Sequence, residues 1–205
     1  MGTILLSTIV TSARVTLLDP SGVTWVDADF IAWANEAQRA ILTVKPNAYR
    51  VKDVVQLDVG SHQVLPAGRL ALLDVYENVI GEATPGRRCI KTNRAALDET
   101  TAVWPVATPE AEARQWLHDA IAPDLYEVYP PNDGTGQLRV LRATIPPILT
   151  LLANTIGVDD AYELPIKYFL IGQAYSANTQ RQDTTKASYF MGEFYKLVGM
   201  RAQGE

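Results

Sequence analysis

DDAYELPIKYFLIGQAYSANTQRQDTTKASYFMGEFYKLVG, residues 159–199, carries the pattern that decides the fold of this chain. In its second half, apolar residues recur at spacings of three and four, which predicts an amphipathic helix with one apolar face. That face comprises Ala187, Phe190, Met191, Phe194, Leu197 and Val198. Asp183 is suited to cap the start of this helix, and Gly199 is suited to end it. Such a face requires a partner surface elsewhere in the chain.

The first half of the stretch predicts another helix. Asp159 and Asp160 indicate a short turn over 159–163, and Pro165 fits best at the first position of the main helix. The two helices are rich in aromatic residues but carry only modest basic charge, so we interpret these residues as core or protein interface and not as a platform for stacked bases. The candidate core and interface residues are Trp33, Tyr168, Tyr175, Tyr189, Phe190, Phe194 and Tyr195.

The N-terminal part of the chain predicts two further helices. The first is expected to end near Leu18, at the breaker cluster of residues 19–22. The second is expected to begin at a cap on Asp27 and to end at residues 45–47. It places Phe30, Trp33 and Ile41 on one face, and we expect the apolar face of residues 187–198 to pack against these three.

From Val51 the apolar period changes from about 3.6 to 2, which indicates strands. A hairpin is expected from residues 55–59 and 62–65, followed by strands near 73–79 and 88–92. A short helical turn is expected at 94–99 and a long loop at 100–113. Two more strands, 125–129 and 138–142, flank residues 130–136, whose composition favours a hairpin turn.

This order of elements predicts an α+β fold, with a discontinuous helical bundle formed by the N- and C-terminal helices and an inserted antiparallel β domain. We expect residues 1–50 and 157–205 to form the bundle and residues 51–146 the β domain. Residues 147–156 are expected to be a linker.

Composition limits the classes of function. The chain has 205 residues and a net charge of −5, which argues against wrapping nucleic acid through a broad basic face. Its single cysteine excludes an internal disulfide. The sequence shows no convincing signal peptide and no long apolar run, so we expect a soluble protein made in the host cytoplasm without a membrane partner.

The sequence offers no convincing chemistry. His62 and His118 stand in strand-like contexts without further metal ligands at suitable spacing, and they are interpreted as surface or edge-strand residues. Residues 132–136 lack the Gly-Lys-Ser/Thr ending of a phosphate-binding loop. The basic patch of Arg87, Arg88 and Lys91 is interpreted as a solvated strand edge. We therefore predict no catalytic residue, no metal site and no cofactor.

Several short segments taken together carry a resemblance to a known family. They are Trp25-x-Asp27-x-x-Phe30-x-x-Trp33-x-Asn35-Glu36-Ala37-Gln38-Arg39, Leu65-Pro66, Leu72-Leu73-Asp74-Val75, Leu125-Tyr126-Glu127-Val128-Tyr129-Pro130-Pro131 and Tyr168 followed by Ala174-Tyr175-Ser176. Over residues 24–199 the chain resembles the head-to-tail adaptor proteins of tailed bacteriophages. It is most similar to the short-tailed-phage branch related to tail tubular protein A.

The resemblance implies a non-enzymatic virion protein at the neck between head and tail. It implies a homo-oligomeric ring, commonly twelve-fold, that docks under the portal protein and receives the tail nozzle or tail tube, while DNA passes through without being read. The β domain would face the tail, and the candidate residues for that surface are Tyr126, Tyr129, Asn132 and Asp133. The alternatives are another neck or tail-completion ring protein and, from a different class, a small hydrolase or nucleotide-binding enzyme.

Overall fold

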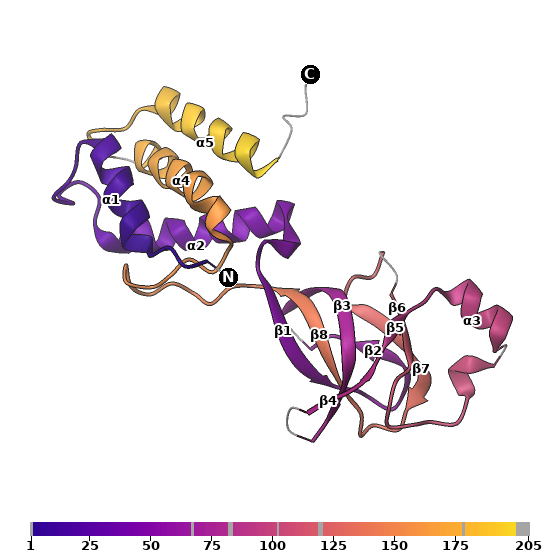
Figure 1. Cartoon of the computed structure of the whole chain (residues 1–205). Helices are drawn as coiled ribbons and strands as arrows, with labels where there is room; N and C mark the ends of the chain where they lie inside the picture. The colour runs from indigo at the N-terminus through magenta and orange to yellow at the C-terminus, as the bar shows by residue number, and fades with distance from the viewer. Residues whose placement is uncertain are drawn as a thin grey trace. The chain divides into compact units, whose positions relative to one another are not determined.

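A computed structural model of the chain describes residues 2–66, 68–81, 84–101, 103–118, 121–177 and 179–199. The chain divides into two units (Figure 1). The helical unit consists of the chain up to Tyr49 together with the chain from Pro146 on, and the β unit is Arg50–Ile145. Along the sequence, helices at both ends flank a central region of strands, which confirms the predicted α+β class. We propose that these two units are the domains of the protein.

The helical unit is organised around its fourth helix. Its helices are α1 (Leu6–Leu17), α2 (Asp27–Val44), α4 (Glu163–Ser176) and α5 (Thr184–Val198), with short 3₁₀ turns at Pro46–Ala48 and Asp160–Tyr162. Helix α4 contacts α1, α2 and α5. Its apolar residues are distributed around the helix, so it is buried on several sides. At Gly172 an added Cβ would lie 2.9 Å from the Met191 side chain, which shows how closely α4 and α5 approach.

The prediction of the surface against which α5 packs was wrong. Its face packs against α4, and α4 in turn packs against α1 and α2, where Phe30 and Ile41 are buried. Direct packing of α5 on Phe30, Trp33 and Ile41 was expected because α2 has a clear apolar face. The apolar residues of α4 lack such a face, so its central position was not apparent. Leu197 was placed on the apolar face of α5, but its side chain is 46% exposed.

The ends of α4 and α5 follow local sequence signals. The Asp183 carboxylate accepts a hydrogen bond from the Lys186 N–H at 3.0 Å, and Gly199 ends α5 with a φ of 89°, as predicted. The expected turn before α4 is the 3₁₀ turn Asp160–Tyr162. Pro165 was expected at the first helical position but occupies the third, where its missing N–H still costs no intrahelical bond.

Helix α1 ends at Leu18, which adopts a left-handed conformation with a φ of 55°. The carbonyls of Leu17 and Leu18 accept hydrogen bonds from the Arg181 guanidinium at 3.3 and 3.2 Å. The next residue, Asp19, accepts three from the backbone N–H groups of residues 23–25. Burial opposes ionisation of Asp19, but these amides and the charge of Arg181 outweigh it and lower the pKa of the carboxyl.

Replacing Leu18 by glycine is expected to stabilise the protein by about 0.5–1 kcal/mol. A left-handed conformation strains any residue with a Cβ, and the relief exceeds the added backbone entropy of glycine in the unfolded chain. The Leu18 side chain is 81% exposed, so its removal sacrifices little packing. Urea denaturation followed by circular dichroism at 222 nm measures the effect.

The matched control is Val15→Gly, which changes an exposed residue within the same helix. It should destabilise the protein by about 0.5 kcal/mol, because glycine is a poor helix former. A loss of stability in Leu18→Gly as well would show that Leu18 is not strained.

The β unit contains two four-stranded sheets. The first has the order β1 (Arg50–Gln56), β8 (Gln137–Thr144), β3 (Arg69–Ile80) and β4 (Thr84–Arg88). The second has the order β2 (Gly60–Val64), β7 (Leu125–Asn132), β6 (Gln115–His118) and β5 (Ile90–Lys91). The β5–β6 pair is parallel, and the other pairs are antiparallel.

Both predicted hairpins were wrong. Strand β1 pairs with β8 and β2 pairs with β7, so residues 57–59 lead from one sheet to the other. Residues 133–136 likewise connect β7 of the second sheet to β8 of the first. The strand expected near 88–92 is divided at Cys89 between β4 and β5, again in different sheets. Turn residues reverse or bend the chain in either arrangement, so they do not identify the partner of a strand.

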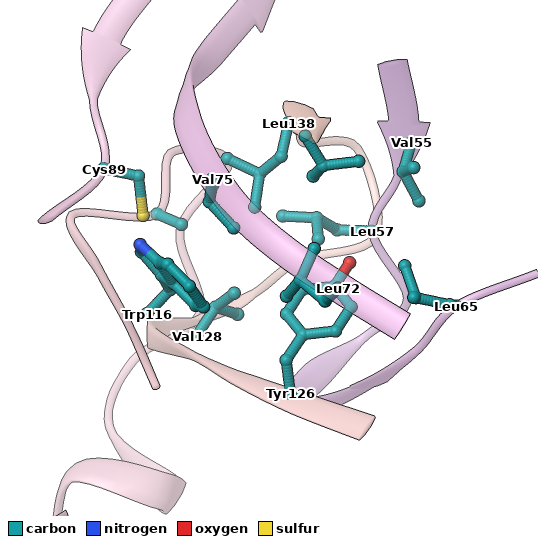
Figure 2. Packing of buried hydrophobic residues seen from close by; sticks show 12 residues of the cluster. Val55, Leu57, Leu65, Leu72, Val75, Cys89, Trp116, Tyr126, Val128 and Leu138 are labelled. Atoms are coloured by element: carbon teal, nitrogen blue, oxygen red, sulfur yellow. The ribbon is translucent and has the colours of Figure 1, made fainter. Parts of the chain in front are cut away.

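The core of the β unit lies between the inward faces of the two sheets. It is formed by Val55, Leu57, Leu65, Leu72, Val75, Cys89, Ala113, Trp116, Tyr126, Val128, Leu138 and Val140. In Figure 2, Val75 and Leu138 face Trp116 and Val128 across this interior. Burial raises the pKa of the Cys89 thiol to about 12, so the single cysteine is held as an unreactive thiol.

A second, smaller cluster lies under the segment that was expected to be a loop. Helix α3 (Arg94–Thr100) confirms the predicted helical turn, and a 3₁₀ turn follows at Trp104–Val106. Trp104 is fully buried with Leu97 and Leu117, and Tyr129 packs against them. The Trp104 indole N–H donates to the Asp98 carboxylate at 2.8 Å. This anchor explains why residues 103–113 follow a defined path without a regular apolar period.

Candidate functional site

Six of the seven candidate aromatic residues of the helical unit lie on α4 and α5, in two groups of neighbouring rings, one around Phe190 and one around Phe194. We call Tyr168, Tyr175, Tyr189, Phe190, Phe194 and Tyr195 the aromatic cluster. The Phe190 ring lies 5.8 Å from Tyr168 and 6.1 Å from Tyr175, measured between centroids. Tyr189 meets Phe190 edge-on at 5.3 Å. Neighbouring rings at such distances stabilise one another beyond the area that they bury.

The aromatic cluster contains one fully buried ring, Phe194, and two exposed rings, Tyr189 and Tyr195, which we call its rim. Phe194 is fully buried, and its ring lies 5.0 Å from Phe169 and 5.1 Å from Tyr195. By contrast, Tyr189 is 62% exposed and Tyr195 is 39% exposed. The structure therefore assigns core packing to Phe194 and leaves Tyr189 and Tyr195 accessible to another molecule.

A pair of charged groups stands beside Tyr175 of the aromatic cluster. The Lys186 ammonium lies 5.1 Å from the Tyr175 ring centroid and 3.1 Å from the Asp183 carboxylate. The hydrogen bond to Asp183 raises the pKa of Lys186, and the hydrogen bond from the Lys186 backbone N–H lowers the pKa of Asp183. Both groups are therefore charged at neutral pH, and their ion pair stands beside the half-buried Tyr175.

Trp33, the seventh candidate, is separate from this cluster. It lies on α2, where its half-buried ring meets Phe30 edge-on at 5.4 Å. Helix α2 packs on α4, whereas the rim residues Tyr189 and Tyr195 belong to α5. Trp33 therefore supports the packing of α2, and its role at an interface remains a prediction.

The four candidate residues of the β unit do not form one surface. Tyr126 is buried in the core, and burial raises the pKa of its hydroxyl. Asn132 is fully buried, and Tyr129 packs against the Trp104 cluster. Asp133 is exposed, and hydrogen bonds from the Thr135 hydroxyl and backbone N–H lower its pKa. A tail-facing role for this region remains a prediction, and of the four side chains Asp133 is the most accessible.

The β unit also contains a pocket of about 640 Å³, which we call the β pocket. Both histidines of the chain line it, His62 from β2 and His118 from β6. Glu127 lies at its floor and is only 8% exposed. Its carboxylate accepts a hydrogen bond from Arg94 and lies 2.9 Å from His62 Nδ1. The His118 Nε2 atom lies 3.2 Å from the carbonyl oxygen of Pro123.

The β pocket was not apparent from the sequence, because its lining residues come from segments far apart in the chain. Lys91 was grouped with Arg87 and Arg88 as one basic patch. In the structure Arg88 ends β4 of the first sheet, whereas Lys91 lies on β5 of the second and lines the pocket. Neighbours in sequence are thus separated, and Lys91 joins His62 and His118 instead.

Searches for two other kinds of site gave negative results. Within the described ranges, no three His, Cys, Asp or Glu side chains are grouped as a metal ion would require. Of the helices that the structure describes, none combines the length and the apolar character needed to cross a membrane.

Comparison with known proteins gave one informative result. The model of a protein family described as "SU10 adaptor protein" matches residues 4–205, which is nearly the whole chain. A search among curated proteins found no match.

Proposed function

The chain belongs to the SU10 adaptor protein family, and on that premise we propose that it forms a ring between the portal and the tail of a phage particle. It is a phage adaptor protein, a structural component of the virion that interacts with other virion proteins. The family match, which extends over both units, is the observation that carries the proposal. In the proposed ring, commonly twelve-fold among such adaptors, the helical unit faces the portal and the β unit faces the tail nozzle or tail tube.

The exposed rim of the aromatic cluster supports self-association. Tyr189, Tyr195 and Leu197 are large apolar or aromatic side chains on one helix, and each is more than a third exposed. Exposed aromatic residues of this kind are enriched at the centres of protein interfaces. We propose that α5 contacts a neighbouring subunit through this rim.

The net charge of −5 supports a role in a DNA channel. DNA carries a dense negative charge, so an acidic wall repels it and discourages adhesion during passage. The protein would then guide DNA without binding a particular sequence.

Co-expression with the portal and tail proteins of the same phage, followed by electron microscopy, tests the proposal. Rings bound to the portal would support a head-to-tail adaptor. Rings bound only to tail components would instead indicate a different neck or tail-completion protein. A persistent monomer that hydrolyses a generic ester or nucleotide would contradict both assignments.

Replacing Tyr189 by alanine is expected to weaken ring assembly by about tenfold or more, while loss of the ring pair with Phe190 lowers the free energy of unfolding by about 1 kcal/mol. The side chain is 62% exposed in the subunit, so its removal affects mainly contacts made on assembly. Mass photometry over a concentration series measures assembly, and urea denaturation measures stability.

Val59→Ala is the matched control, because Val59 is 74% exposed and lies in the β unit, outside the aromatic cluster. If Tyr189→Ala assembles normally, the rim is not the contact between subunits. The same conclusion follows if Val59→Ala weakens ring assembly as much as Tyr189→Ala does.

A further inference from the structure

The β pocket combines a basic rim with an apolar wall. We propose that it binds a short peptide segment in which carboxylates stand next to apolar side chains. The inference rests on the proposed function only in taking this segment from another virion protein. The binding chemistry follows from the β unit alone, since every lining residue belongs to it.

The first step of the argument is charge. The pocket is lined by the cation Lys91, by Arg94 and by two histidines, and among the lining residues that the structure describes Glu127 is the one carboxylate. Glu127 is already bound by Arg94 and His62. The Lys91 ammonium lies 5.0 Å from the Trp116 ring centroid, and it pairs with no carboxylate of the residues that the structure describes. Among the residues that the structure describes, the lining of the β pocket therefore carries positive charge that no carboxylate balances.

This charge is a local exception. Residues 51–146 carry 9 basic and 13 acidic side chains, so the sequence around the pocket is acidic overall. An acidic partner would be repelled by most of this surface and attracted at the β pocket. Such complementarity contributes orientation and specificity at an interface.

The second step is the apolar wall. Val64 is 54% exposed and Leu125 is 45% exposed, and with the buried Leu117 they line the same pocket. A small inorganic anion would leave these side chains in water. A peptide with apolar side chains beside its carboxylates would cover them and gain the free energy of burying them.

The third step is size. A volume of about 640 Å³ lies within the range of pockets that hold ligands, about 300–1,000 Å³. It can hold a few residues of an extended chain but no folded domain. The occupant that fits is therefore a segment or terminus of a partner.

The two histidines give a direct test, since they are the only two in the chain and both line the pocket. The full-length protein, labelled with carbon-13 at histidine, is titrated at constant pH with a blocked pentapeptide of alternating aspartate and leucine. We expect saturable shifts of both imidazole signals. The same peptide with asparagine for aspartate should cause no shift, and the one with serine for leucine should bind at least about fivefold more weakly.

Lys91→Glu reverses the unpaired charge of the rim and should weaken binding of the acidic peptide at least about fivefold. Arg88→Glu is the matched control, because it reverses an exposed basic residue outside the pocket and should change binding less than about twofold. Equal effects of the two variants, or equal binding of the asparagine or serine peptide, would overturn the proposal.

Ring assembly with the portal is measured separately on the wild type. If rings form but the peptide does not bind, the inference about the pocket is wrong and the proposed function stands. If the peptide binds but no ring forms, the proposed function is wrong and the pocket assignment stands.

Discussion

Replacing Phe194 by alanine is expected to destabilise the helical unit by about 3–5 kcal/mol. The Phe194 side chain is fully buried, and its ring packs against Phe169 of α4 and Tyr195 of α5. Alanine would leave a cavity where the two helices meet, and the close approach at Gly172 leaves the backbones little freedom to collapse into it. Thermal and urea unfolding, followed by circular dichroism at 222 nm, measures the loss.

Tyr195→Ala provides the comparison within the same helix. Tyr195 is 39% exposed, so its truncation should cost less than half as much as that of Phe194. If Phe194→Ala keeps its thermal stability but fails to form rings, then Phe194 is an interface residue and the packing of α5 on α4 is incorrect.

The sequence predicted the boundaries of α5 better than its partner. A cap, a stop residue and an apolar period are local properties, and Asp183, Gly199 and Phe194 have their expected local roles. The partner depends on which surface of the rest of the chain fits this face. Apolar residues are distributed evenly around α4, so the sequence did not indicate that this helix contacts α1, α2 and α5, the other helices of the helical unit.

The same distinction applies to the β unit. The alternation of apolar and polar residues identified most strands. The pairing of β1 with β8 and of β2 with β7, however, joins segments about 60–90 residues apart. Local turn composition cannot specify such pairs. The β pocket was missed for the same reason, since His62, Lys91 and His118 come together only after the second sheet has formed.

The candidate site residues were partly predictable. Tyr189 and Phe194 were both chosen as core or interface residues because they are aromatic residues of the same predicted helix. The helical period indicates which residues lie near the apolar face, but it does not say how deeply each side chain is buried. The structure separates them, with Phe194 buried and Tyr189 exposed. Asn132 was expected on the tail-facing surface of the β domain, whereas its side chain is buried.

Replacing Asn132 by aspartate is expected to destabilise the β unit by about 3 kcal/mol or more. The Asn132 amide nitrogen donates to the carbonyls of Glu110 and Ala111, both at 3.0 Å. Its amide oxygen accepts from the backbone N–H groups of Gly134 and Gly136 at 2.8 and 3.2 Å. A carboxylate keeps the acceptor but removes both donations and places a negative charge against the carbonyl oxygens of Glu110 and Ala111.

Hydrogen exchange, measured by mass spectrometry on peptides covering residues 108–138, reports the local loss of stability around residue 132. Protection of the segment should fall by about a hundredfold or more, which corresponds to the loss of about 3 kcal/mol. Asp133→Asn is the matched control, because Asp133 is exposed and an amide oxygen can still accept from Thr135. Its protection should change less than about threefold. Equal protection in the two variants would show that the four hydrogen bonds of Asn132 do not hold the connection between β7 and β8.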